Sequence, residues 1–120
     1  MFKSLMAVLS LVAGLFLATT TVYAQGSEAY LEITLKIEND DRGAAVAVYE
    51  KYKQPFLDNV GGAESKQLLV REDDVQVLHG FATTDAAHAY IQSEMFTKDV
   101  VGELGPLLAA DPEVRIYMTH

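Results

Sequence analysis

Apolar and polar residues alternate strictly from Tyr30 to Ile37, which predicts a strand with one buried face. Glu38 to Asp41 then provide turn residues and acidic side chains that favour a helix start. After these residues, apolar residues recur every three or four positions, which predicts a helix. This helix is expected to kink or end its regular part near Pro55 and to terminate at Gly61-Gly62. The apolar positions of this helix are Ala44, Ala45, Val48, Tyr52, Phe56 and Val60.

The second half of the chain predicts a hairpin, a second helix and a last strand. The hairpin consists of two period-2 stretches on either side of the acidic connector Glu72-Asp73-Asp74. Thr83-Thr84-Asp85 predict the start of the helix, whose apolar positions run from Ala86 to Leu107 with a break between Met95 and Lys98. The four predicted strands are Tyr30–Ile37, Ser65–Arg71, Val75–Ala82 and Val114–Thr119.

This order of elements, β-α-β-β-α-β, predicts an α+β domain with the ferredoxin-like fold, in which both helices cover one face of a four-stranded antiparallel sheet. The other face then has no cover. Four side chains expected on it, those of Thr34, Leu69, Leu78 and Tyr117, are together too apolar to be left in water. We therefore expect two copies to pack their sheets face to face, as a homodimer with a dimeric α/β barrel.

The N-terminal segment has the pattern of a secretory signal peptide. Lys3 precedes an apolar stretch from Leu5 to Ala18, and Val22-Tyr23-Ala24 has small residues at the positions that a signal peptidase requires. The stretch is short for a membrane span, which favours cleavage over an uncleaved anchor. We expect a signal peptide at residues 1–24, a single domain at residues 25–120, no stable membrane insertion after cleavage, and a periplasmic or secreted location.

The composition narrows the range of partners. The formal net charge is −8, and an acidic domain repels nucleic acid, so no nucleic-acid partner is expected. The acidic residues are scattered, which indicates a solvated surface. The chain has no Cys, so no disulfide can support this small domain, and association with a second copy is the remaining source of burial.

His79 is the most informative residue for chemistry, because it falls between Val77 and Phe81 on one face of a strand expected in the middle of the sheet. Such a His is more often a core residue with one bonded nitrogen than a pocket residue, and the sequence leaves both interpretations open. No second His or carboxylate has ligand spacing to it, so no metal is expected. His88 is expected on the surface.

Aromatic residues are the other enriched class, with Tyr49, Tyr52 and Phe56 on the first helix. They are core residues in most proteins, but two helices on a sheet can also enclose a cleft for a small apolar or aromatic ligand. His79 and Tyr90 are the candidate catalytic residues. The candidate ligand-binding residues are Tyr52, His79, Phe81, Tyr90 and Phe96.

Gly61 to Ser65 have the pattern of a turn and strand after the first helix, and Val75 to Phe96 that of a strand with an aromatic residue at its end followed by a capped helix. In these two segments the chain resembles the antibiotic biosynthesis monooxygenase-like family of dimeric α/β-barrel proteins. The resemblance implies cofactor-independent oxygenation of an aromatic or polyketide-like molecule. Many members have Trp where this chain has Phe81 and His where it has Tyr90, so haem ligation in the family's style is not implied and no cofactor is expected. A non-catalytic, stress-related binding or interaction module is the alternative.

Overall fold

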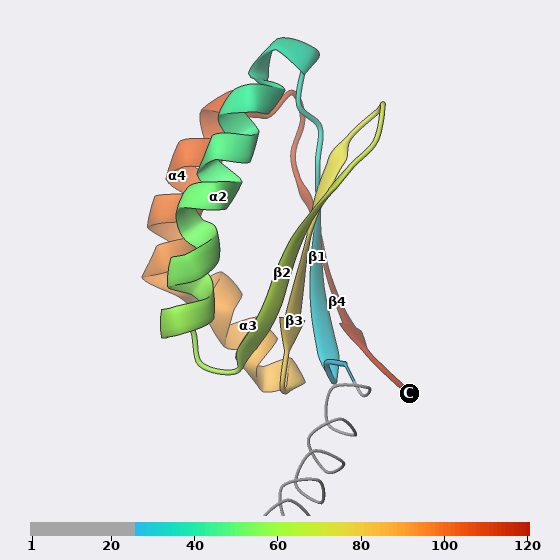
Figure 1. The fold of residues 1–120 in the computed structure, drawn as a ribbon, viewed down its shortest axis with the longest axis vertical. Coiled ribbons are helices and arrows are strands. Elements are labelled where there is room, and N and C mark those ends of the chain that lie inside the picture. Colours follow the sequence, from blue (N-terminus) through green and yellow to red (C-terminus); the bar gives the residue numbers. More distant parts are fainter. Residues whose placement is uncertain (1–25) are drawn as a thin grey trace, which may run out of the picture.

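The computed structural model describes residues 26–120, so the predicted signal peptide lies outside the described residues (Figure 1). The elements of this part follow the predicted β-α-β-β-α-β order, with the second helical segment divided in two. None of its helices is both long enough and apolar enough to cross a membrane. The bounds are β1 Ala29–Leu35, α2 Arg42–Asn59, β2 Ala63–Val70, β3 Val75–Phe81, α3 Thr84–Gln92, α4 Val101–Leu104 and β4 Glu113–Met118.

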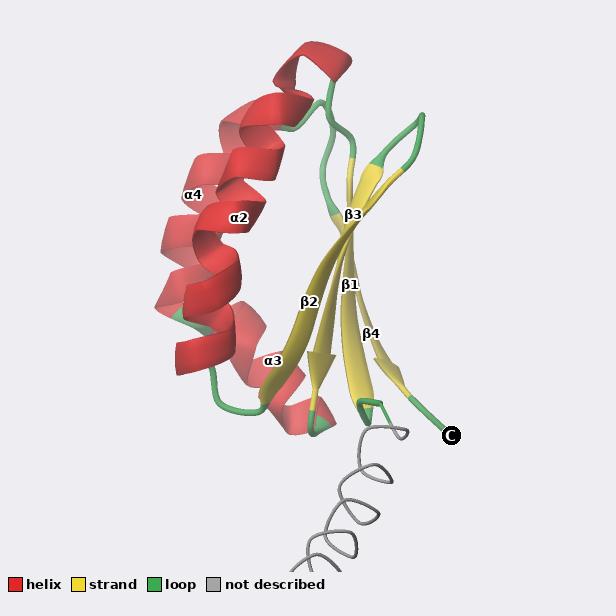
Figure 2. Ribbon diagram, viewed as in Figure 1, coloured by secondary structure: helices red, strands yellow, loops and turns green. Residues whose placement is uncertain are grey.

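The four strands form one antiparallel sheet in the order β2-β3-β1-β4. All helices lie on one side of this sheet, and the other side is open (Figures 1 and 2). This arrangement confirms the predicted ferredoxin-like α+β fold, and the strand bounds agree with the prediction to within two residues. On the covered face, His79 of β3 pairs with Leu31 of β1 and with Lys66 of β2.

Helix α2 continues through Pro55 to Asn59, whereas the sequence predicted a kink or an end near the proline. A proline removes only one backbone donor, so the helix can continue where the residues that follow stay packed. Phe56 is fully buried, and its carbonyl accepts a hydrogen bond of 3.1 Å from the Val60 N–H. Packing of Phe56 therefore holds the last turn of α2 in place.

The second helical segment begins as predicted but breaks earlier. The Thr83 hydroxyl accepts a hydrogen bond of 3.1 Å from the Ala86 N–H, which confirms the predicted N-cap. Helix α3 ends before Ser93, whose hydroxyl donates to the Tyr90 carbonyl at 2.6 Å and competes with the helical backbone bonds. Met95–Val100, where the break was expected, form a π-helical turn that continues into α4.

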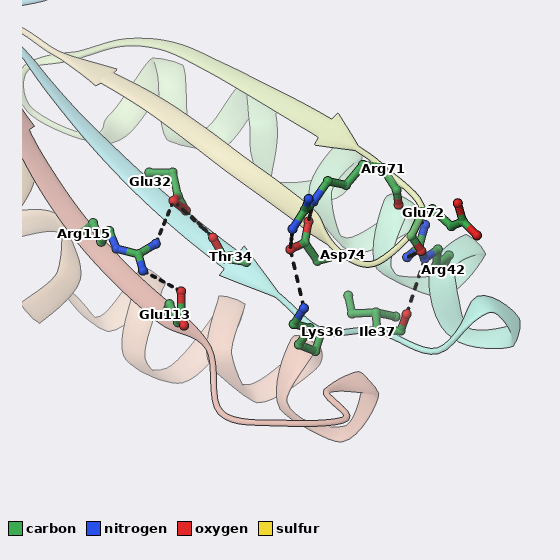
Figure 3. A network of polar contacts seen from close by, with 10 residues as sticks. All are labelled: Glu32, Thr34, Lys36, Ile37, Arg42, Arg71, Glu72, Asp74, Glu113 and Arg115. Carbon is green, nitrogen blue, oxygen red and sulfur yellow. Dashed lines mark hydrogen bonds and ion pairs between the residues drawn. The ribbon is translucent and has the colours of Figure 1, made fainter.

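The four side chains predicted on the uncovered face do share it, because Thr34, Leu69, Leu78 and Tyr117 lie out of phase with the buried rows of the sheet. The centre of this face is more polar than predicted. Glu32 is buried there, accepts a hydrogen bond of 2.7 Å from the Thr34 hydroxyl, and lies 3.4 Å from the Arg115 guanidinium (Figure 3).

The acidic hairpin connector also differs from the prediction of a solvated surface. Asp74 is buried, and its carboxylate accepts two hydrogen bonds, of 2.7 and 2.8 Å, from Arg71 (Figure 3). This guanidinium lowers the pKa of Asp74. Arg42 donates to the carbonyls of Arg71 and Glu72 at 2.7 Å each and so joins the start of α2 to the hairpin. The charges at this end of the sheet therefore hold the fold together.

Candidate functional site

A cavity of about 80 Å³ lies between the covered face of the sheet and the helices. Strands β1 and β3 contribute apolar side chains to its floor, α2 forms one wall, and the π-helical turn and α4 form the other. Val101, which is 45% exposed, places one side of the cavity at the protein surface. The residues that could provide chemistry are Tyr49, Tyr52, Lys66 and His79, and the aromatic ring of Phe96 lies beside them.

Lys66 is a cavity residue that the sequence analysis missed. Only 5% of it is exposed, although lysine is almost never fully buried without a partner. Its position follows from strand periodicity, because Lys66 is in phase with Leu68 and Val70 on the covered face of β2. A lysine in phase with the apolar row of a strand was the signal that could have identified it.

The Lys66 ammonium group has aromatic rings as neighbours instead of a carboxylate. Its Nζ lies 5.2 Å from the centroid of the Phe56 ring and 5.7 Å from that of Tyr49. Within residues 26–120, it has no hydrogen bond and no carboxylate at ion-pair distance. Burial therefore lowers the pKa of Lys66 from 10.5 to about 8.

His79 is 2% exposed and lies beside Lys66 across the β2–β3 ladder. Its Nδ1 is 3.0 Å from the Leu31 carbonyl oxygen, which can only accept, so Nδ1 carries the proton and Nε2 of the neutral ring is an acceptor. Burial lowers the pKa of His79 to about 3, which keeps the ring neutral at physiological pH. The structure thus gives His79 the bonded nitrogen of a core residue and a place in the cavity lining as well.

Both tyrosine hydroxyls of the cavity wall are already bonded to the protein. The Tyr49 hydroxyl donates to the Lys66 carbonyl at 2.9 Å. The Tyr52 hydroxyl donates to the carboxylate of Glu103 on α4, which also pairs with Lys51 at 3.0 Å. The bond to Glu103 raises the pKa of Tyr52. These bonds tie α2 to the sheet and to α4, and they leave Lys66 and His79 as the polar groups for a ligand.

The five predicted ligand-binding residues separate into two groups. Tyr52, His79 and Phe96 line the cavity, whereas Phe81 and Tyr90 lie outside its lining. Tyr90 nevertheless packs on the predicted site residues, with its ring centroid 5.5 Å from that of His79 and 5.3 Å from that of Phe96. Its buried hydroxyl has no hydrogen-bond partner in the described part of the chain, and burial raises its pKa. Tyr90 is thus placed in an aromatic cluster behind the cavity, and its catalytic role stays a prediction.

The described residues contain no group of three or more His, Asp or Glu side chains that could hold a metal ion. His88, expected on the surface, is exposed on α3.

The polar groups that the cavity offers to a ligand are one buried amine, that of Lys66, and one neutral imidazole, that of His79, in a largely apolar wall.

Comparison with solved structures identifies proteins of the same fold. A candidate antibiotic biosynthesis monooxygenase from Caulobacter crescentus has a TM-score of 0.68 at 20% identity, over 79% of this chain and 92% of that protein. A second candidate, from Nitrosomonas europaea, has a TM-score of 0.65 at 11% identity, over 76% and 97%. A conserved protein from Methanosarcina mazei has a TM-score of 0.67 at 15% identity, over 82% and 99%.

Many of the structural neighbours are antibiotic biosynthesis monooxygenase-like proteins, which confirms the expected resemblance at the level of the fold. The sequence matches no protein-family profile and has no significant match among curated proteins. Because all the identities are low, the likeness establishes the architecture, and the function has to be argued from the cavity.

Proposed function

We propose that this chain is an exported, homodimeric protein that binds a small apolar or aromatic molecule in the cavity between the helices and the sheet. The observation that carries this proposal is a largely apolar cavity with one buried amine and one neutral imidazole in its lining. Ligand sites in proteins combine apolar walls with a few such polar groups. Titration calorimetry with single-ring aromatic compounds tests the proposal, and a complete absence of binding would refute it.

The size of the cavity favours a single aromatic ring. Its volume of about 80 Å³ is smaller than the roughly 150 Å³ of an engineered cavity that binds benzene. A ring therefore enters with a small displacement of the wall, and a larger polyketide-like molecule extends past the exposed Val101 into solvent. We expect affinity to fall when a substituent is added to the buried end of the ring and to change little when it is added to the outer end.

For the activity, we propose cofactor-independent oxygenation of the bound aromatic molecule. Support comes from the neighbours with this fold that carry the description antibiotic biosynthesis monooxygenase, and from the apolar enclosure of the ring. With hydroquinone as substrate, one atom of O₂ enters the ring, which becomes hydroxybenzoquinone, and the other leaves as water, so the substrate itself supplies the electrons. Isotopically labelled O₂ and mass spectrometry of the product test this reaction against a control without protein.

A non-catalytic binding or interaction module remains the second candidate. It is favoured by the bonds that already occupy Nδ1 of His79 and the hydroxyls of Tyr49 and Tyr52. This candidate predicts that the ring binds without any uptake of O₂. The labelling experiment and the calorimetric titration, carried out on the same preparation, separate the two candidates.

The proposed dimer uses the uncovered face of the sheet. Leu69 is 44% exposed on this face, diagonally across the β2–β3 pair from the half-buried Leu78. Val70, its neighbour in the same edge strand, is 60% exposed with its side chain on the opposite face. Leu69→Lys should therefore weaken the dimer in sedimentation experiments, while Val70→Lys should not. A wild-type protein that stays monomeric at micromolar concentration would refute the dimer.

Export is proposed from the N-terminal sequence pattern alone. Processing by a signal peptidase should give a protein that begins at or near Gln25. Mass spectrometry of the protein isolated from its natural source measures this N-terminus. A full-length chain that stays in the membrane fraction would contradict the proposal.

A further inference from the structure

The buried charged residues of this protein differ in whether they have a partner of opposite charge. Asp74 has Arg71 at 2.7 Å and Glu32 has Arg115 at 3.4 Å, so each buried carboxylate has a basic partner. Lys66 is equally buried but has no acidic partner within residues 26–120. A buried charge without a partner is costly, and it is found chiefly where function requires it.

The aromatic neighbours do not replace a counter-ion. The rings of Phe56 and Tyr49 are within the range of cation–π attraction, at 5.2 and 5.7 Å from Nζ. Such contacts leave the hydrogen-bond donors of the ammonium group unused, because a ring face accepts them only weakly. Lys66 also lines the cavity, so a ligand bound there would lie beside this side chain.

We propose that Lys66 makes this cavity selective for an aromatic ligand with an acidic oxygen, which binds as the anion against the Lys66 ammonium group. The ligand class comprises phenols, enols and aromatic carboxylic acids. The inference rests on the proposed binding function and adds to it the chemical group that the site recognises. Tyr49 and Tyr52 do not compete with Lys66 for the anion, because their hydroxyl protons are already donated to protein acceptors.

The pairing has a consequence that can be measured on the ligand itself. An ammonium group next to a phenol favours the phenolate, so the pKa of a bound phenol falls below its value in water. The neutral His79 adds no positive charge to this effect. A lower pKa of the bound phenol is therefore a signature of Lys66 and not of apolar burial, which would raise the pKa.

The test uses 4-nitrophenol, whose phenolate is coloured, together with 4-nitrobenzoate and the neutral ether 4-nitroanisole. Near neutral pH, the wild-type protein should bind one or both acids at least tenfold more tightly than the ether. Lys66→Met should weaken binding of the acids by roughly 10- to 100-fold, as expected for a lost charge-assisted hydrogen bond, and change binding of the ether by less than about threefold. The acid that binds more tightly shows whether the site prefers a phenolate or a carboxylate.

Lys53→Met is the matched control. Lys53 lies near the same Tyr49 ring, at 5.8 Å, but is exposed on the outer side of α2. It should leave the affinities and the pKa of bound 4-nitrophenol unchanged, whereas Lys66→Met should abolish the fall in that pKa. If the Lys66 variant keeps its preference for the acids, the inference is wrong and the proposed binding function stands. If no probe binds to the wild-type protein, the proposed function fails and this inference fails with it.

Discussion

Replacing Lys66 by Met should stabilise the protein near neutral pH. Methionine keeps the length and the apolar stem of lysine, so packing against Phe56 and Tyr49 is retained while the buried charge is removed. A pKa that falls from 10.5 to about 8 corresponds to a free-energy cost of about 3 kcal/mol for the charged form. Residual hydration of the ammonium group and its attraction to the rings reduce this value. We therefore expect a gain of about 1–2 kcal/mol in the free energy of unfolding.

This gain should depend on pH in a definite direction. Below about pH 8, Lys66 is protonated in both the folded and the unfolded chain, and the wild-type protein carries the full cost. Between about 8 and 10.5, the folded protein releases the proton while the unfolded chain keeps it, so the stability of the wild type rises relative to that of the variant. Above 10.5, lysine is neutral in both states and the difference becomes small.

Urea denaturation of the wild type, Lys66→Met and Lys53→Met across this pH range measures the effect. Taking the difference between proteins at each pH cancels the contributions of all other titrating groups. The Lys53 variant should follow the wild type, because its side chain is exposed. A Lys66 variant that is less stable at neutral pH, or a difference that does not change with pH, would show that Lys66 is not an uncompensated buried cation.

Three further substitutions test the surroundings of the cavity by urea denaturation. His79→Leu should lower the free energy of unfolding by roughly 1–3 kcal/mol, because the Leu31 carbonyl loses its side-chain donor; an unchanged midpoint would contradict this. Tyr90→Phe should raise it by about 1 kcal/mol, since the hydroxyl removed has no partner among residues 26–120, and a loss of stability would reveal a hidden partner. Gly62→Ala should lower it by at least about 1 kcal/mol, because φ is +78° and a Cβ there would lie 2.6 Å from that of Ala86. Gly61→Ala, with open space around it, is the control for the last variant and should be nearly neutral.

The order and type of the main elements could be predicted from the sequence, because the signals are local. Alternation over Tyr30 to Ile37 and the cap at Thr83 depend on a few neighbouring residues, and the structure confirms both. The same alternation places His79 on the covered face of β3. Local signals predicted the helix ends less well. Helix α2 continues past Pro55 because Phe56 is packed in the core, and α3 ends before the predicted break because the Ser93 hydroxyl bonds to the Tyr90 carbonyl.

The candidate site was predicted only in part. Tyr52, His79 and Phe96 line the cavity, but periodicity could not distinguish them from Tyr90, which is buried on the same side of the sheet. The path of the chain after α3 decides which of these residues reach the cavity. The extended backbone at Ser93 and the π-helical turn after it place Phe96 at the cavity while Tyr90 packs behind it.

The sequence by itself thus determined the elements, their order and the face on which each strand residue lies, because periodicity and capping act within a few residues. Only the tertiary structure decided which charges are buried and what surrounds them. Strand phase places Lys66 on the covered face, but it does not show that the side chain is buried without an acidic partner, and Asp74 was predicted on a solvated surface. Burial depends on what the rest of the fold places around a residue. Asp74 is enclosed by the neighbouring Arg71 and by Lys36 from a distant segment, whereas α2 covers Lys66 with aromatic rings and places no carboxylate at ion-pair distance.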